Sequence, residues 1–140
     1  SLSGWTTSGT VDFVSNTARF GMGNAVGPHS ISQTIATVAG RTYELSFEYG
    51  DFQAWNQSLV ATATGATNLL TTAHIVTDQA STGMFRYVYT FVADSSATTI
   101  TLTDTSDQSG LTAVGTVGTD GFVDNVSVRQ LNGNMGSISY

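Results

Sequence analysis

Carboxylates and histidines are the residues of this chain that could carry catalysis, and their spacing argues against it. The two glutamates, Glu44 and Glu48, stand four residues apart in an alternating segment, or about 13 Å apart along a strand at ~3.3 Å per residue. Carboxylate pairs that cleave glycosidic bonds lie about 5 to 9.5 Å apart, so we expect both glutamates on a solvated sheet face. The only histidines are His29 and His74, and there is no cysteine, which excludes a Cys-His nucleophile and a zinc site. We therefore predict that the protein is not an enzyme.

Aspartates late in the chain could bind calcium instead. Ca²⁺ takes about six to eight oxygen ligands from carboxylates, amides and backbone carbonyls. The candidate ligands are Asp104, Asp107, Asp120 and Asp124. In the alternative interpretation Asp124 hydrogen-bonds to backbone at a strand entrance, while Asp104 and Asp107 lie in a solvated turn. The sequence leaves a structural calcium and this alternative both open.

A tryptophan in a polar segment is the best candidate for a sugar-binding residue. Sugar recognition needs an exposed aromatic ring for the C–H faces, and amides and carboxylates for the hydroxyls. Trp55 is the aromatic candidate, and its polar neighbours are Asp51, Gln53, Asn56 and Gln57. The alternative is that Trp55 caps the end of the core or packs at a subunit contact. Trp5 follows a glycine at the start of the predicted fold, and we expect it in the core.

The charge balance excludes other classes of partner. Charged residues make up 10% of the chain, and four arginines against ten acids give a net charge of -6. Without a basic patch to neutralise phosphates, we expect no nucleic-acid partner. No stretch of ~18 apolar residues is present, so we expect no membrane insertion. Thr, Ser, Asn and Gly dominate the polar positions, a composition typical of extracellular, cell-surface and virion-surface β proteins.

Alternation of apolar and polar residues predicts the elements that position these groups. It is clearest in segments 42–49, 85–92, 99–103 and 122–128. Segment 69–80 has near-helical spacing, but its threonines favour a strand. We predict an all-β sandwich or jelly roll of about eight to ten strands over residues 1–130. Residues 131–140 are then a glycine-rich tail.

Strand parity predicts one hydrophobic core. Its main residues are expected to be Ile35, Leu45, Phe47, Phe91, Ile100 and Val126. The tyrosines with the parity of the large apolar residues are expected there too, namely Tyr43, Tyr49, Tyr87 and Tyr89. In the last strand, alternation places four side chains on the same face of the sheet. They are Phe122, Asp124, Val126 and Val128.

The order of several motifs resembles the galactose-binding-like β-sandwich family over residues 4–130. The motifs are Gly4-Trp5, segments 30–37, 40–49 and 85–93, and the ending Asp124-Asn125-Val126-Ser127-Val128. Members are mostly carbohydrate-binding modules and surface-attachment domains, and similar endings occur in phage structural proteins. In this family the aspartate that matches Asp124 is a calcium ligand. A strand that usually precedes Gly-Trp is missing before Gly4, so the resemblance implies a trimmed strand, an open sheet edge, or an edge that another subunit fills.

Two functions follow from these observations. The first is a non-catalytic extracellular or surface carbohydrate-binding module, whose partner is a glycan or cell-surface polysaccharide. The second is a structural subunit of a virion (a decoration or fibre domain) or of a secreted filament. Such a subunit would form a homo-oligomer or polymer through edge-strand or tail contacts. Low charge and the missing first strand favour the second function. The apolar residues of the tail would dock on a neighbouring subunit, and they are Leu131, Met135, Ile138 and Tyr140. The frequency of binding modules in the family favours the first.

Overall fold

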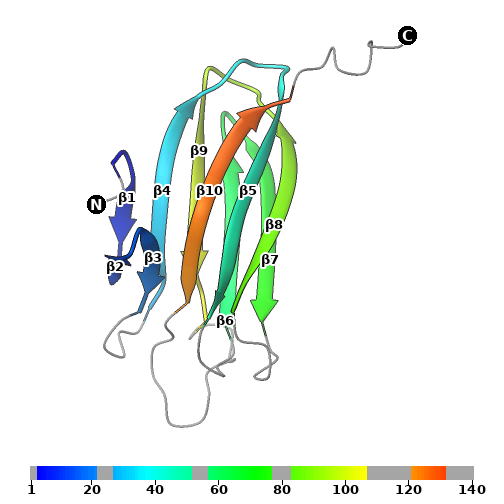
Figure 1. The fold of residues 1–140 in the computed structure, drawn as a ribbon. Helices are drawn as coiled ribbons and strands as arrows, with labels where there is room; N and C mark the ends of the chain where they lie inside the picture. The colour runs from blue at the N-terminus through cyan, green and yellow to red at the C-terminus, as the bar shows by residue number, and fades with distance from the viewer. Residues whose placement is uncertain (1–2, 22–26, 52–56, 77–82, 107–120, 132–140) are drawn as a thin grey trace.

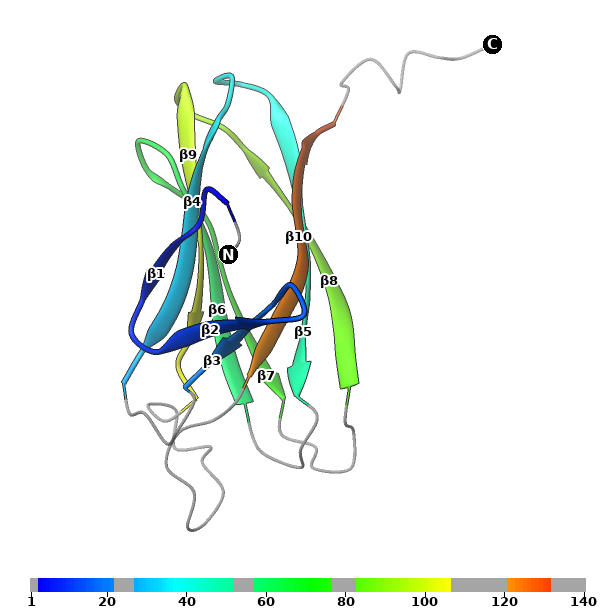
Figure 2. The same cartoon turned by 60° about the vertical axis from the view of Figure 1, so that its left-hand side comes forward.

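A computed structural model describes residues 3–21, 27–51, 57–76, 83–106 and 121–131. These residues form ten β-strands, arranged in two five-stranded sheets that face each other as a sandwich (Figure 1, Figure 2). The all-β class and the predicted number of strands are confirmed. The described ranges contain no helix long and apolar enough to cross a membrane.

The first sheet has the strand order β1-β4-β9-β6-β7, and all its neighbours are antiparallel. Its strands are β1 (Thr6–Ser8), β4 (His29–Ala36), β9 (Ala97–Asp104), β6 (Gln57–Thr64) and β7 (Asn68–Val76). Strand β7 confirms that the ambiguous segment is extended as far as Val76, the last residue described there, since the strand pairs with β6. Its threonines fit a pleated surface better than a helix.

The second sheet has the strand order β2-β3-β10-β5-β8, also antiparallel throughout. Its strands are β2 (Val11–Val14), β3 (Thr17–Phe20), β10 (Phe122–Gln130), β5 (Thr42–Asp51) and β8 (Gly83–Val92). Strand β10 pairs with β5 from Phe122 to Gln130, with one break in register between Asp124 and Ser127. The outer face of this sheet carries the candidate site described below.

The core lies between the sheets and follows most of the predicted parity. Leu45, Phe47, Phe91 and Ile100 are buried, as predicted. Tyr43 and Tyr49 are also buried, whereas Tyr87 and Tyr89 are half-buried against the core.

Three further core predictions need correction. Ile35, Val126 and Trp5 are half-buried rather than fully buried. They line one pocket of about 190 Å³, at the side of the sandwich between β4 and β10, where β2 and β3 cross only the lower part (Figure 2). Their side chains close the core at this side and do not lie in its centre.

The predicted parity of the last strand is wrong because β10 contains a β-bulge. Asp124 is opposite Glu48 and Ser127 is opposite Ser46, so β10 has one residue more than β5 over this stretch. Asn125 takes up the extra residue with φ 50°, a left-handed conformation that asparagine tolerates better than most residues. The buried side chain before the bulge is therefore Val123, and Val126 and Val128 pack against the core after it.

An aspartate at the end of β8 fixes the β6–β7 turn. Asp94 accepts hydrogen bonds from the backbone N–H groups of Ala66 and Thr67 at 2.8 and 2.9 Å, and from Thr67 Oγ1 at 2.7 Å. A side chain at Gly65 would collide with the Asp94 carboxylate, so glycine is required there. The Thr67 hydroxyl hydrogen bond is the largest cause of the lowered pKa of Asp94, because it stabilises the ionised carboxylate.

Candidate functional site

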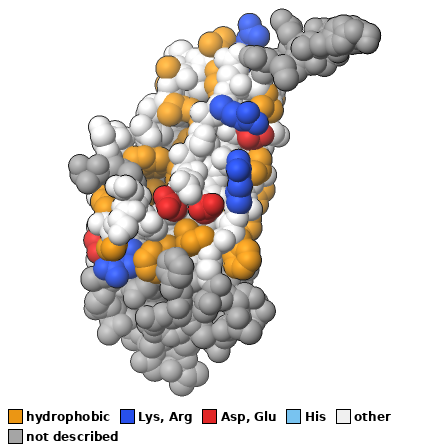
Figure 3. All heavy atoms as spheres, viewed as in Figure 1, with side chains coloured by type: hydrophobic (Ala, Val, Ile, Leu, Met, Phe, Trp, Pro, Cys, Tyr) orange, Lys and Arg blue, Asp and Glu red, His pale blue; other side chains and the backbone are white. Residues whose placement is uncertain are grey.

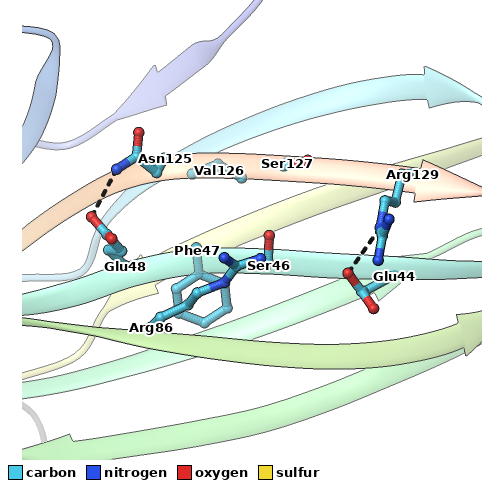
Figure 4. Close-up of a pocket in the computed structure, with 9 residues that line it drawn as sticks. All are labelled: Glu44, Ser46, Phe47, Glu48, Arg86, Asn125, Val126, Ser127 and Arg129. Carbon is cyan, nitrogen blue, oxygen red and sulfur yellow. Dashed lines mark hydrogen bonds and ion pairs between the residues drawn. The ribbon is translucent and has the colours of Figure 1, made fainter.

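A groove of about 590 Å³ lies on the outer face of the second sheet (Figure 4). It crosses three adjacent strands, β8, β5 and β10. Its lining consists of Glu44, Ser46, Phe47, Glu48, Arg86, Asn125, Val126, Ser127 and Arg129. The polar residues reach this face because they alternate with core residues along each strand.

The groove lies beside the bulge in β10. A bulge bends its strand and increases the local twist, and here it interrupts the pairing of β10 with β5 beside Phe47. Val126 and Phe47 lie next to the groove on its core side, and Phe47 itself has no exposed surface. The groove therefore lies where the pairing of β10 with β5 is interrupted.

Charged side chains of both signs gather on this face (Figure 3). Arg129 Nε donates to Glu44 Oε1 at 3.0 Å, and only 17% of the Glu44 side chain is exposed. Asn125 Nδ2 donates to Glu48 Oε2 at 2.8 Å. Each glutamate is therefore held by a donor from β10.

Arg86 occupies the middle of the groove. Its guanidinium points toward Ser46 and away from Glu48 (Figure 4). Ser46 is 7% exposed and lies opposite Ser127 in the ladder. Neither ion pair found between described side chains includes Arg86.

Two exposed apolar side chains lie on the same face of β8 as Arg86, outside the lining of the groove. Val88 lies opposite Ser46, and Val92 lies opposite Thr42. Both are about half exposed, at 47% and 53%. The face therefore combines hydrogen-bonding groups with two exposed valines, which Thr90 separates.

The predicted Trp55 site lies mostly outside the described residues, so the prediction stays untested. This applies to Gln53, Trp55 and Asn56, and Asp51 is described only as the last residue of β5. Gln57 differs from the prediction, because it has no exposed surface and its Oε1 accepts a hydrogen bond from Ser106 Oγ at 3.0 Å. The structure does not support a ligand contact by Gln57.

The predicted calcium ligands are only partly described. Asp107 and Asp120 lie outside the described residues. Asp104 is buried in the first sheet, where its Oδ1 accepts from the N–H of Ser106 at 2.9 Å. It therefore does not lie in the solvated turn that the alternative interpretation expected.

Asp124 lies in the second sheet with different partners. Its Oδ2 accepts from Thr17 Oγ1 at 3.3 Å and its Oδ1 from the N–H of Asn125 at 2.7 Å. Within the described part of the chain, no group of three or more His, Cys, Asp or Glu residues could hold a metal ion. The described aspartates do not form a calcium site by themselves, and calcium remains a prediction.

Sequence reasoning did not identify the groove. Alternation predicts a solvated face for Glu44 and Glu48; the structure places them on the outer face but inside a hollow. The usable signal was the outward parity of Arg86 and Arg129 on two other strands. The register that brings these strands together depends on long-range pairing and on the bulge, and neither is a local property of the sequence.

Comparisons with known proteins agree with this architecture. A sequence model of the family described as "Protein of unknown function (DUF642)" matches residues 1–129. A search of curated proteins finds no match.

Three solved structures illustrate the structural similarity. The N-terminal cellulose-binding domain of β-1,4-glucanase C from Cellulomonas fimi has a TM-score of 0.61 at 15% identity, over 94% of this chain and 91% of that one. TmCBM61, solved with β-1,4-galactotriose, has a TM-score of 0.61 at 15% identity, over 93% and 90%. Tailspike protein 4 of bacteriophage CBA120 has a TM-score of 0.58 at 14% identity, over 94% of this chain but 20% of the tailspike chain.

The structural matches show a β-sandwich fold that the chain shares with carbohydrate-binding modules, which agrees with the fold that the motifs implied. By its sequence match over residues 1–129 of 140, the chain belongs to the DUF642 family.

Proposed function

We propose that this chain is a non-catalytic carbohydrate-binding module that acts outside the cell or at a cell surface, and that the groove over β8, β5 and β10 is its glycan site. The observation that carries the proposal is the groove itself, a polar hollow across three strands, with two exposed valines on the same face of the sheet. Two proteins of similar fold are described by their ligands, cellulose and β-1,4-galactotriose. Glycan binding is the function that the fold and the groove support together.

The groove has the groups that sugar recognition requires. Carboxylates accept hydrogen bonds from sugar hydroxyls, and serine hydroxyls accept or donate them. Glu44 and Glu48 are already oriented by their partners on β10. The C–H faces of a sugar can pack on Val88 and Val92, which are exposed on the same face of the sheet. Pre-oriented groups lower the entropic cost of binding.

Binding without hydrolysis is consistent with the same geometry. The two glutamates lie four residues apart in β5, about 13 Å along the strand, beyond the separation of paired carboxylates in glycosidases. A module of this kind would bind a polysaccharide without cleaving it.

Affinity electrophoresis in gels that contain neutral and acidic plant and bacterial polysaccharides tests the proposal. We expect at least one polysaccharide to retard the protein, and Ser127→Trp to abolish that retardation by filling the groove. The matched control is Ala73→Trp, an exposed position on β7 of the other sheet. If no polysaccharide retards the wild type, or if Ser127→Trp binds as well as Ala73→Trp, the proposed site is wrong.

The Trp55 loop remains a second candidate for glycan contact. If it is the site, Trp55→Ala should abolish retardation and leave the melting temperature nearly unchanged. A large loss of stability with retained binding would show that Trp55 is a core residue.

The alternative function is a structural subunit of a virion or secreted filament, and incomplete sheet edges favour it. Among the described residues, β3 pairs with only Phe122 and Val123 of β10, and β1 pairs only with residues 30–32 of β4. Unpaired strand edges bind other strands. Light scattering tests this function: a homo-oligomer that becomes monomeric on deletion of residues 131–140 supports it, and a monomeric intact chain contradicts it.

A further inference from the structure

Arg86 does not make the ion pair that its position predicts. It lies directly opposite Glu48 in the β5–β8 ladder, where oppositely charged side chains on one face normally interact. Glu48 instead accepts a hydrogen bond from Asn125 at 2.8 Å. The Arg86 guanidinium extends toward Ser46 in the middle of the groove (Figure 4).

The surroundings of Arg86 are rich in donors. A guanidinium has five N–H donors and no acceptor, and the hydroxyls of Ser46 and Ser127 lie opposite each other on the adjacent strands. Arg129, the other cation of the groove, is engaged by Glu44 at 3.0 Å. The centre of the groove therefore suits an acceptor with a negative charge.

We propose that the glycan bound here carries a sugar acid whose carboxylate binds Arg86 beside Ser46 and Ser127. This inference rests on the proposed glycan-binding function and specifies its ligand. A planar guanidinium matches a carboxylate in bidentate geometry, and a uronic acid is the common sugar that offers one. Arg86 is then the residue that determines specificity.

The two glutamates restrict how many acidic sugars the groove accepts. Glu44 and Glu48 lie on either side of Ser46 in β5, and both line the groove. Their charges repel a second carboxylate and their oxygens accept hydrogen bonds from neutral sugars. The net charge of -6 also disfavours densely charged polymers. The ligand therefore has isolated acidic sugars in an otherwise neutral chain.

Nitrogen-15 NMR of the arginine side chains tests the carboxylate contact directly. The chain has four arginines, so the spectrum holds four Nε–H signals, and Arg86→Gln assigns that of Arg86 by its loss. Methyl β-D-glucuronoside should shift the Arg86 signal, and methyl β-D-glucoside should not. Arg41, which is exposed and lies outside the groove, is the internal control.

Three results would overturn this assignment. Equal shifts with both glycosides would show that the carboxylate is not recognised, and an Arg41 shift as large as that of Arg86 would indicate non-specific ion pairing. A shift with galactose 6-sulfate but none with glucuronoside would assign Arg86 to sulfate instead.

Gel retardation distinguishes a failure of the proposed acidic ligand from a failure of the proposed glycan-binding function. Glucuronoxylan, with isolated acids, should retard the protein more than polygalacturonate, and Arg86→Gln should weaken retardation by glucuronoxylan about 10- to 100-fold, as expected for loss of a hydrogen bond to a charged group. Arg41→Gln should have no effect. If only neutral polysaccharides retard the protein, and they retard wild type and Arg86→Gln equally, the acidic ligand is wrong but the glycan-binding function stands. No retardation by any polysaccharide removes the proposed function as well.

Discussion

At the scale of single residues, Phe47 links the core to the groove. Its side chain has no exposed surface, and its ring lies 5.7 Å from that of Tyr87 and 6.4 Å from that of Tyr89, centroid to centroid. It also lies between Ser46 and Glu48, which face the groove. The packing of one aromatic ring therefore helps to fix the polar residues on both sides of it in β5.

Phe47→Ala should lower the free energy of unfolding by about 3 to 5 kcal/mol, through lost burial and the cavity that remains. Urea denaturation measures this change. Val38→Ala is the control, because Val38 is 55% exposed and its loss should change stability by less than about 0.5 kcal/mol. A loss below about 1 kcal/mol for Phe47→Ala would contradict the assigned core.

Asp94 should make the stability of the fold depend on acid pH. The Thr67 hydrogen bond lowers the pKa of Asp94 in the folded protein, so its contribution is fully present above the unfolded value of about 3.9. It is lost as the pH falls through the lower folded pKa. Urea midpoints from pH 2 to 6 should therefore show a gap between wild type and Asp94→Asn that narrows at low pH. A gap of constant size would refute the role of the ionised carboxylate.

At the scale of elements, the bulge in β10 shapes both the core and the groove. It places Val123 and Val126 on the same side of the sheet although their positions have opposite parity, and it directs Asn125 toward Glu48. The left-handed conformation of Asn125 is the local requirement for this arrangement.

Substitutions at Asn125 test that requirement. Asn125→Gly keeps the conformation accessible and should be nearly neutral for stability, whereas Asn125→Val should cost about 1 to 2 kcal/mol because a β-branched residue is strained at positive φ. Denaturant unfolding of the two variants gives the difference. Equal stability of the two would show that the bulge does not depend on residue 125.

The elements were predictable from the sequence where local alternation decides them. Segments 42–49 and 99–103 alternate cleanly and form β5 and β9 in the predicted phase. Alternation alone fails in the last strand because one inserted residue reverses its phase, and an asparagine in a strand was the only local sign of it. The groove was not predictable, because Glu44, Arg86 and Arg129 are brought together by pairing between distant segments.

At the scale of the whole molecule, calcium is the remaining sequence prediction that bears on stability. Asp124 is half-buried in β10, and two of the other predicted ligands, Asp107 and Asp120, lie outside the described residues. An ion that binds only the folded state raises its stability by mass action. If calcium is bound, chelation should lower the melting temperature and Asp124→Ala should remove that effect. An unchanged melting temperature together with no metal by elemental analysis would exclude calcium.

The sandwich presents its groove on one broad face, while its predicted tryptophan loop lies between β5 and β6. We assign the ligand to the groove and not to the Trp55 segment. The distinction can be measured residue by residue.

The most direct test is backbone amide NMR with the polysaccharide fragment that binds best in gels. We predict that the largest chemical-shift changes fall on residues 44–48, 86–88 and 125–129, which line or border the groove. Changes confined to residues 51–57, or spread over the first sheet, would contradict the assignment of this groove as the glycan site.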